Sequence, residues 1–314
     1  MSSPADAAAG GPSVLVGCLE ETRDTLEQLL RLGERPDHLV CITPEEAARQ
    51  RLPNYVDMRP LAEAAGISWS TVREYSMKTP EDVELFRRLR PSALLVVGWQ
   101  RLLPEAVLET AVLGTLGFHG SCDFLPWGRG RSPINWSIIE GRNRFILHMF
   151  LISPGVDDGD VVGMRVYDVN EWDDCRSLYY KTAIAQAELL ALHLPRLRRG
   201  ACPGLPQVGE PFYYPKRTPE DGRIDWSAPA EAICRLVRAV TWPYPGAFCF
   251  LEGERMTVWR AQPFSGDFFG KATPGEVCFT TDNGTGEFVV RCGDGTVLVT
   301  RSEGAVPRGG DVLS

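Results

Sequence analysis

The chain of 314 residues lacks several features that would place it in a common class at once. No window approaches the roughly 18 uninterrupted apolar residues that a transmembrane helix needs. The start, MSSPADAAAGGPS, lacks the basic and then apolar order of a signal peptide. The first turn, GCLEET, contains neither GxGxxG nor GxxxxGK[ST], which argues against a cradle for a dinucleotide or a nucleoside triphosphate. An ordinary globular protein without a membrane partner is therefore expected.

The chain is also poor in clustered positive charge and in paired cysteines. Its 33 Lys and Arg against 41 Asp and Glu give a formal net charge of −8 and a pI near 5.2. Phosphate contacts need clustered Lys and Arg, so a nucleic-acid partner is not expected. Nine cysteines, an odd number without CxxC, predict reduced thiols, a cytoplasmic location and no metal centre. The sequence leaves the oligomeric state open.

Strand and helix patterns alternate with short links from Val14 onward, which is typical of an α/β, Rossmann-like, doubly wound and mostly parallel sheet. The residues expected in strands are 13–18, 38–42, 69–73, 93–97 and 112–118. Gly and Pro mark a linker over 200–206, and five short alternating runs after it predict a small OB-type β-barrel. We expect a disordered lead at 1–12, a larger domain at 13–205 and an OB-like domain at 206–314.

One stretch, residues 114–160, concentrates the residues that could carry chemistry. His119 is expected where the strand 112–118 ends, and residues 120–131 are too rich in Gly and Pro for anything but a loop. Ser132 followed by Pro133 matches an N-cap and the first helical position. A buried strand over 145–152 then leads to an acidic turn at 154–160. A lone histidine is more often structural and an Asp-rich turn is usually only a turn, but together they could place an imidazole and a carboxylate in one pocket.

Two motif blocks resemble a known family. HGSCDFLPWGRGRSPINW followed by PGVDDGD is similar to the signature of the 10-formyltetrahydrofolate-dependent formyltransferases, NxHxSLLPxxRGxxP and then a VDTGD-like turn. PFYYPKRTPEDGRIDWSAPAEAICRLVRAVTWPYPGAF resembles the start of the carboxy-terminal domain of methionyl-tRNA formyltransferase and the UDP-4-amino-4-deoxy-L-arabinose formyltransferases. The resemblance spans most of residues 90–265, and it implies 10-formyltetrahydrofolate as the formyl donor.

The resemblance implies that His119 and Asp157 are catalytic. Formyl transfer to an amine passes through a tetrahedral intermediate, so the site must take a proton from the amine and stabilise an oxyanion. A histidine suits the proton transfer because its imidazole titrates near neutrality. Asp157 would orient the imidazole or an ordered water and balance its charge. Asp158 is the alternative one position along, and Asp160 is expected to form the turn.

The chain departs from the family pattern at Gly117, where the family carries an asparagine that donates to the oxyanion. Loss of one such donor typically costs about 100- to 1000-fold in rate. Candidates to replace it are Ser121, Asn135 and main-chain N–H groups near Gly117. The loop between His119 and Leu125 is two residues longer than usual, so Asp123 could either contact a substrate ammonium group or remain a plain polar loop residue.

The donor and any anionic group are expected on neighbouring loops. After the strand 93–97 comes a loop that resembles the family's pterin-binding loop, and the acidic turn is expected to contribute on the same side. The residues expected at the folate are Gln100, Arg101, Leu102, Leu103, Val156, Asp158 and Asp160. Arg129 and Arg131 could hold a pyrophosphate or the folate glutamate tail, or could instead pair with the acidic turn.

Three functions remain open from the sequence. The favoured one is N-formylation of a small-molecule amine, most simply that of a nucleotide-linked amino sugar. The alternative is a methionyl-tRNA formyltransferase, which the carboxy-terminal domain favours. Residues 206–314, however, carry 11 Lys and Arg against 14 Asp and Glu, a net charge of −3 that suits tRNA poorly. A formyltetrahydrofolate hydrolase is the third, since the missing asparagine would permit loss of transfer.

Overall fold

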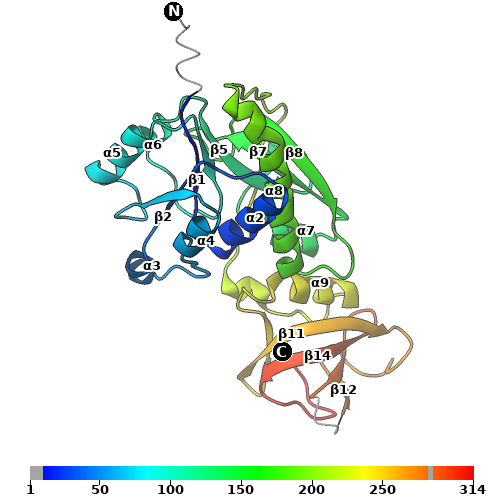
Figure 1. The fold of residues 1–314 in the computed structure, drawn as a ribbon. Helices are drawn as coiled ribbons and strands as arrows, with labels where there is room; N and C mark the ends of the chain where they lie inside the picture. Colours follow the sequence, from blue (N-terminus) through cyan, green and yellow to red (C-terminus); the bar gives the residue numbers. More distant parts are fainter. Residues whose placement is uncertain (1–9, 282–285) are drawn as a thin grey trace, which may run out of the picture. The chain divides into compact units, whose positions relative to one another are not determined.

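A computed structural model describes residues 10–281 and 286–314 (Figure 1). These residues form two compact units. Unit 1 comprises 10–129, Ile146–Tyr167 and Tyr180–Phe212. Unit 2 comprises Gly130–Phe145, Asp168–Tyr179 and the described residues from Tyr213 onward. Two segments that precede residue 206 therefore group with unit 2 by their contacts. The division at 206 stays a prediction about separately folding domains.

Unit 1 is built on a seven-stranded sheet with the order β3-β2-β1-β4-β5-β7-β8. The strands are β1 (Ser13–Val16), β2 (His38–Cys41), β3 (Ser68–Thr71), β4 (Ala93–Val96), β5 (Thr115–Ser121), β7 (Arg144–Leu151) and β8 (Val161–Asp168). The first five pair in parallel, while β7 runs antiparallel to β5. The α/β fold with a mostly parallel sheet is confirmed.

The central strands are buried on both faces because helices cover them, which explains their continuous apolar runs. All four residues of β1, SVLV, are buried, as are Ala93, Leu94 and Leu95 of β4. The helices that accompany the sheet are α2 (Glu20–Arg31), α3 (Pro44–Gln50), α4 (Arg59–Ala64), α5 (Pro80–Leu89), α6 (Glu105–Leu108) and α8 (Cys175–Arg198). Helices α2 and α8 lie side by side (Figure 1), joined by hydrogen bonds from Gln186 to Thr25 and Glu21.

Three local expectations around His119 need correction. Strand β5 does not end before His119 but continues to Ser121, because His119, Gly120 and Ser121 pair with β7. Part of the expected loop 120–131 is the short strand β6 (Trp127–Gly130), which pairs with β9 (Phe212–Tyr214). A partner about 85 residues away thus overrides the local Gly-rich signal. Helix α7 (Pro133–Ile139) does begin after Ser132, but the Ser132 side chain makes no capping hydrogen bond and its φ is 60°.

Unit 2 contains a five-stranded antiparallel sheet with the order β10-β11-β14-β13-β12. Its strands are β10 (Ala247–Leu251), β11 (Glu254–Ser265), β12 (Val277–Thr280), β13 (Phe288–Arg291) and β14 (Thr296–Gly304). Leu313 bridges to Leu251 beside one edge strand, and Val312 bridges to Glu276 before the other. A 3₁₀ turn, η1 (Pro219–Gly222), and helix α9 (Ala230–Val240) precede the sheet, and α9 packs on β11 and α7.

Candidate active site

His119 lies near the end of β5 with only 8% of its side chain exposed. Its Nε2 is 2.9 Å from the main-chain oxygen of Gly128, at the second residue of β6. A carbonyl oxygen can only accept, so Nε2 carries the proton in this hydrogen bond. The nitrogen of His119 that can gain or lose a proton is therefore Nδ1.

Asp157 comes from the turn between β7 and β8, and its Oδ2 lies 3.4 Å from His119 Nδ1. Since β7 runs antiparallel to β5, with Leu151 opposite Leu116, the turn must double back along β5 to reach His119. Asp157 itself adopts a φ of 53°, a conformation that is uncommon for a residue with a side chain. The turn therefore brings the carboxylate next to an imidazole that lies 38 residues earlier in the sequence.

The neighbouring acidic residues are engaged in holding the turn. Asp158 accepts a hydrogen bond from the Ser153 hydroxyl, and the Asp160 main-chain oxygen accepts from Leu151 N–H at 2.9 Å. At Gly159, a Cβ would stand 1.7 Å from the Leu151 oxygen, so only glycine allows this close approach. Of the two adjacent aspartates, it is Asp157 that faces the imidazole.

The family asparagine position, Gly117, is closed by an apolar side chain. A Cβ at Gly117 would stand 2.9 Å from Ile152 Cδ1 and 3.0 Å from Ile152 Cγ1. Gly117 lies two residues before His119 on β5 and therefore on the same face of the sheet. The space that an amide side chain would need beside the imidazole is thus occupied by Ile152.

The expected substitutes for that amide are engaged elsewhere. Ser121 is fully buried and donates its single hydroxyl proton to the Trp127 oxygen at 2.8 Å. Asn135 belongs to unit 2, where its amide nitrogen donates to the Ala239 oxygen at 2.6 Å and fixes α7 against α9. Asp123 is exposed and accepts from the Phe124 N–H at 2.9 Å. Main-chain N–H groups remain as candidates for the oxyanion.

The two arginines of the GRGR segment have different surroundings. Arg129 is buried, and its Nε and Nη2 donate to Gln207 Oε1 at 3.2 and 2.7 Å. Arg131 is exposed and belongs to unit 2. An anion-binding role therefore suits Arg131 better than Arg129, whose guanidinium is partly committed to Gln207.

The loop after β4 offers unpaired main-chain groups beside an exposed apolar side chain. Gln100 N–H donates to the Tyr75 hydroxyl at 2.7 Å, and the Trp99 ring lies 4.4 Å from the Tyr75 ring, so the start of the loop is anchored. Within the described residues, no hydrogen bond reaches the main chain of Arg101, Leu102 and Leu103. Leu102 is 84% exposed. Free donors and acceptors beside a leucine fit a flat heterocycle with polar edges, such as a pterin.

Register places this loop at the level of the histidine. Leu95 of β4 lies opposite Leu116 of β5, so the parallel strands bring Gly98 level with His119 three residues later. Val156, the residue before Asp157, is 54% exposed. The donor set proposed for the folate thus comes from two segments that border His119.

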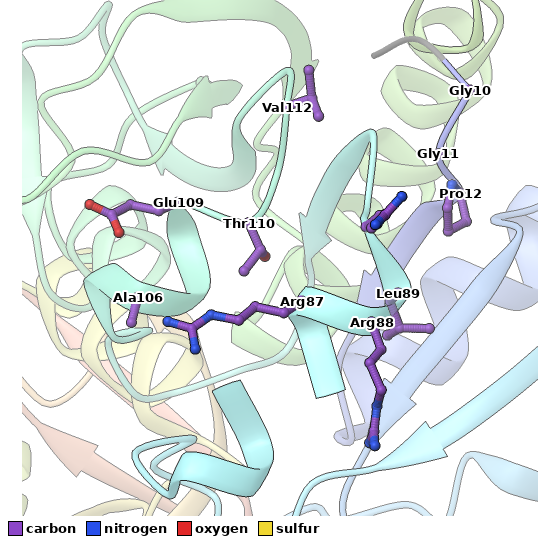
Figure 2. Close-up of a pocket in the computed structure, with 11 residues that line it drawn as sticks. Gly10, Gly11, Pro12, Arg87, Arg88, Leu89, Ala106, Glu109, Thr110 and Val112 are labelled. Carbon is purple, nitrogen blue, oxygen red and sulfur yellow. The ribbon is translucent and has the colours of Figure 1, made fainter. Parts of the chain in front are cut away.

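A cleft of about 680 Å³ in unit 1 lies at the opposite edge of the sheet. It is formed where the chain enters β1, β4 and β5, with Arg87, Arg88 and Glu109 among its residues (Figure 2). Figure 2 shows Arg87 extending toward Ala106 while Arg88 points another way, so the two charges do not converge. Ligands of open α/β sheets collect at the carboxyl ends of parallel strands, and this cleft lies at the amino ends.

Sequence reasoning missed four groups that build the site. No sequence pattern marks the Gly128 oxygen or the Tyr75 hydroxyl as part of the site, because every residue has a main-chain oxygen and a single tyrosine indicates no particular contact. Gln207 directly follows the predicted linker 200–206, and nothing in the sequence around it indicates a role in the site. His148 could have been noticed as a second histidine on the strand after the loop, but its position opposite His119 follows from antiparallel pairing. Among the described residues, no group of three His, Cys, Asp or Glu is placed to hold a metal ion.

The chain thus combines an α/β unit, which holds the buried His119 beside the partly exposed Asp157, with an antiparallel β unit that follows it in the sequence. A family model described as "Formyl transferase" matches residues 34–194, and one described as "Formyl transferase, C-terminal domain" matches residues 216–305. The chain belongs to the formyl transferase family. The expected formyltransferase activity, and formyltetrahydrofolate as the donor that the family uses, are thereby confirmed.

Individual relatives agree with this assignment. The chain is 33% identical to the methionyl-tRNA formyltransferase of Citrifermentans bemidjiense over 289 residues, which is 91% of this chain and 86% of the relative. HypX from Aquifex aeolicus, solved in complex with tetrahydrofolic acid, is similar with a TM-score of 0.63 at 21% identity over 97% of this chain. The chain spans under half, 46%, of that HypX chain. An N-formyltransferase from Helicobacter canadensis, in complex with folinic acid and dTDP-3-aminofucose, shares the fold (TM-score 0.61, 13% identity, 92% and 98% covered).

Proposed function

We propose that this formyltransferase transfers the formyl group of 10-formyltetrahydrofolate to the amino group of methionyl-tRNA. The observation that supports this acceptor is the extent of the similarity. The 33% identity to a methionyl-tRNA formyltransferase runs through 91% of the chain and so includes the carboxy-terminal part as well as the His–Asp pair. This reverses the order favoured by sequence reasoning, in which net charge ranked a small-molecule amine first.

A nucleotide-linked amino sugar is the second candidate acceptor, and charge is the observation that favours it. The net charge is −8 for the chain and −3 for residues 206–314, whereas a tRNA surface needs clustered cations. Among the described residues of unit 2, several of the arginines are also engaged. Arg238 donates to the Asp173 oxygen, Arg291 donates to the Gly295 oxygen, and Arg217 lies 5.0 Å from the centroid of the Trp136 ring.

The proposed chemistry of the site rests on His119 Nδ1. Nε2 is fixed by the Gly128 oxygen, so Nδ1 accepts the proton that the attacking amine must lose. The same proton can then pass to the tetrahydrofolate nitrogen as its bond to the formyl carbon breaks. Asp157 Oδ2, at 3.4 Å, balances the positive charge that the imidazole then carries. Folate supplies the formyl carbon when it is bound, and the loop from Gly98 to Pro104 together with Val156 would hold it. The Ile152 side chain, in place of an amide, leaves main-chain N–H groups to face the formyl oxygen.

The experiment is an acceptor comparison with 10-formyltetrahydrofolate as donor. The expected result is formylation of charged initiator tRNA at a rate well above that of a panel of nucleotide-linked amino sugars, with His119→Ala as the control for active-site chemistry. Formylation of a sugar but not the tRNA would replace the first candidate with the second. Release of formate without any acceptor would identify a hydrolase and overturn both.

A further inference from the structure

Gln207, in unit 1, forms hydrogen bonds with two segments that hold the His–Asp pair: strand β6, through Arg129, and the acidic turn that carries Asp157. Its Nε2 donates to the main-chain oxygens of Asp157 and Gly159, each at 2.8 Å. Its Oε1 accepts from Arg129 Nε and Nη2 at 3.2 and 2.7 Å. An amide group has two N–H protons and two oxygen lone pairs, and all four are used here.

The amide orientation is determined by these neighbours. The Asp157 and Gly159 oxygens can only accept, and the Arg129 guanidinium can only donate, so the reverse orientation would leave every contact unfavourable. A glutamine satisfied on both ends is a rigid connector, because neither half can rotate without losing two hydrogen bonds.

These contacts close a ring around the proposed catalytic pair. His119 is held by the Gly128 oxygen, and the residue after Gly128 is the Arg129 that binds Gln207. From Gln207 the ring returns through the Asp157 main chain to the Asp157 carboxylate, 3.4 Å from His119. Strand β6 and the acidic turn are therefore tied to each other at the point where each touches the imidazole.

We infer that Gln207 is a positioning residue for formyl transfer, and that it sets the distance between His119 Nδ1 and the Asp157 carboxylate. The inference rests on the proposed roles of His119 and Asp157. Asp157 needs such support because its φ of 53° is an unfavourable conformation for a residue with a side chain. Without the hydrogen bonds from Gln207 to the main-chain oxygens of Asp157 and Gly159, the turn is free to relax, and the Asp157 carboxylate can then move.

Two substitutions separate the halves of the connector. Gln207→Glu keeps an acceptor for Arg129 but turns a carboxylate oxygen toward the Asp157 and Gly159 oxygens, which repel it. Gln207→Leu removes all four hydrogen bonds. Because a displacement of about 1 Å in a catalytic group can cost about 100-fold, we expect kcat to fall by about 10- to 100-fold in both variants. The KM values for donor and acceptor should change by less than about threefold.

Gln186→Leu is the matched control. Gln186 is 2% exposed and also uses both ends of its amide, accepting from Thr25 Oγ1 at 2.7 Å and donating to Glu21 Oε1 at 2.6 Å. It joins α8 to α2 and takes no part in the ring around His119. Its loss should lower the melting temperature at least as much as Gln207→Leu does, while kcat stays within about twofold of wild type. Equal kcat losses in the two leucine variants would show that Gln207 acts only on stability.

Crystal structures of the wild type and of both Gln207 variants give a readout that needs no acceptor. The expected result is a separation of His119 Nδ1 from Asp157 Oδ2 well beyond the 3.4 Å of the wild type. An unchanged separation, or wild-type kcat in Gln207→Glu, would overturn the inference. If the wild type formylates no tested acceptor, the proposed function fails, whereas the separation in the variants still decides the role of Gln207.

Discussion

His119 and His148 face each other across β5 and β7, yet their surroundings differ in almost every respect. Residues directly opposite on antiparallel strands project on the same face, so the two imidazoles are neighbours. His119 has a main-chain acceptor on one nitrogen and a carboxylate near the other. His148 is 1% exposed, its Nε2 accepts only a long hydrogen bond of 3.4 Å from Leu125 N–H, and the Phe124 ring lies edge-on to it.

The difference in surroundings explains why only one of the two neighbouring histidines can serve as a base. The pKa of His148 is lowered to about 4, mainly by burial; a hydrogen bond with the His119 main chain opposes this shift, and the charge of the His119 imidazole adds to it. His148 is therefore neutral at physiological pH. The two histidines together can carry at most one positive charge, that of a protonated His119. The environment of each imidazole, rather than its identity, decides which one can serve as a base.

The largest expected effect separates the two histidines by activity. His119→Ala should lower the rate of formyl transfer by at least about 100-fold with donor binding retained, because a general base is lost. His148→Gln keeps an acceptor for the Leu125 N–H and should lower the rate by less than about threefold. Steady-state rates and donor titrations measure both. Similar losses in the two variants would remove the distinction between them.

The second prediction concerns the acidic turn, which brings a carboxylate to His119 but not to His148. Gly159→Ala should destabilise the protein by about 3 kcal/mol, since its Cβ would meet the Leu151 oxygen at 1.7 Å and the main chain must shift. The control is Gly266→Ala, where the nearest atom is the Asp294 oxygen at 3.9 Å. That variant should stay within about 0.5 kcal/mol of wild type. Denaturant unfolding of the two proteins checks the difference, and equal stabilities would contradict the packing described for the turn.

The smallest effect concerns pH and stability. Because the pKa of His148 is about 4 when folded and near 6.5 when unfolded, the unfolded state binds the extra proton between these values. Stability that is full above pH 6.5 is therefore lost as the pH falls toward 4, by about 2 kcal/mol at pH 5 from this residue. His38 and His193, whose pKa values burial also lowers, add a loss of the same sign. His148→Gln should reduce the difference in unfolding free energy between pH 7 and pH 5, and an unchanged difference would contradict the burial of this imidazole.

The sequence predicts the strands and helices that neighbouring residues determine, but not the pairing of strands that lie far apart in the chain. The buried run SVLV and the helix that begins at Pro133 were readable because apolar continuity and a proline at the first helical position are properties of neighbouring residues. The pairing of His119 with His148 was not readable, since the direction of β7 depends on how the whole chain folds. The Gly-rich sequence of β6 predicts a loop, because the strand that pairs with β6 lies some 85 residues later in the chain.

The site shows the same division. Motif spacing identified His119 and Asp157, and the structure brings their side chains to 3.4 Å. The sequence could not show that Ile152 fills the space beside Gly117, because that contact joins residues 35 positions apart. Ser121 and Asn135 were reasonable oxyanion donors by residue type, but Ser121 donates its hydroxyl proton to the Trp127 oxygen, and Asn135 donates one amide proton to the Ala239 oxygen. Within the part of the chain that the structure describes, no helix is both long and apolar enough to span a membrane.

The most direct test of the central claim is a double-mutant cycle on the rate of formyl transfer, with His119→Ala, Asp157→Asn and the two combined. If the carboxylate acts through the imidazole, Asp157→Asn alone should lower the rate by about tenfold or more, and adding it to His119→Ala should change the rate by less than about twofold. Losses that multiply in the combined variant would mean that Asp157 acts independently of His119, and the proposed pair would have to be abandoned.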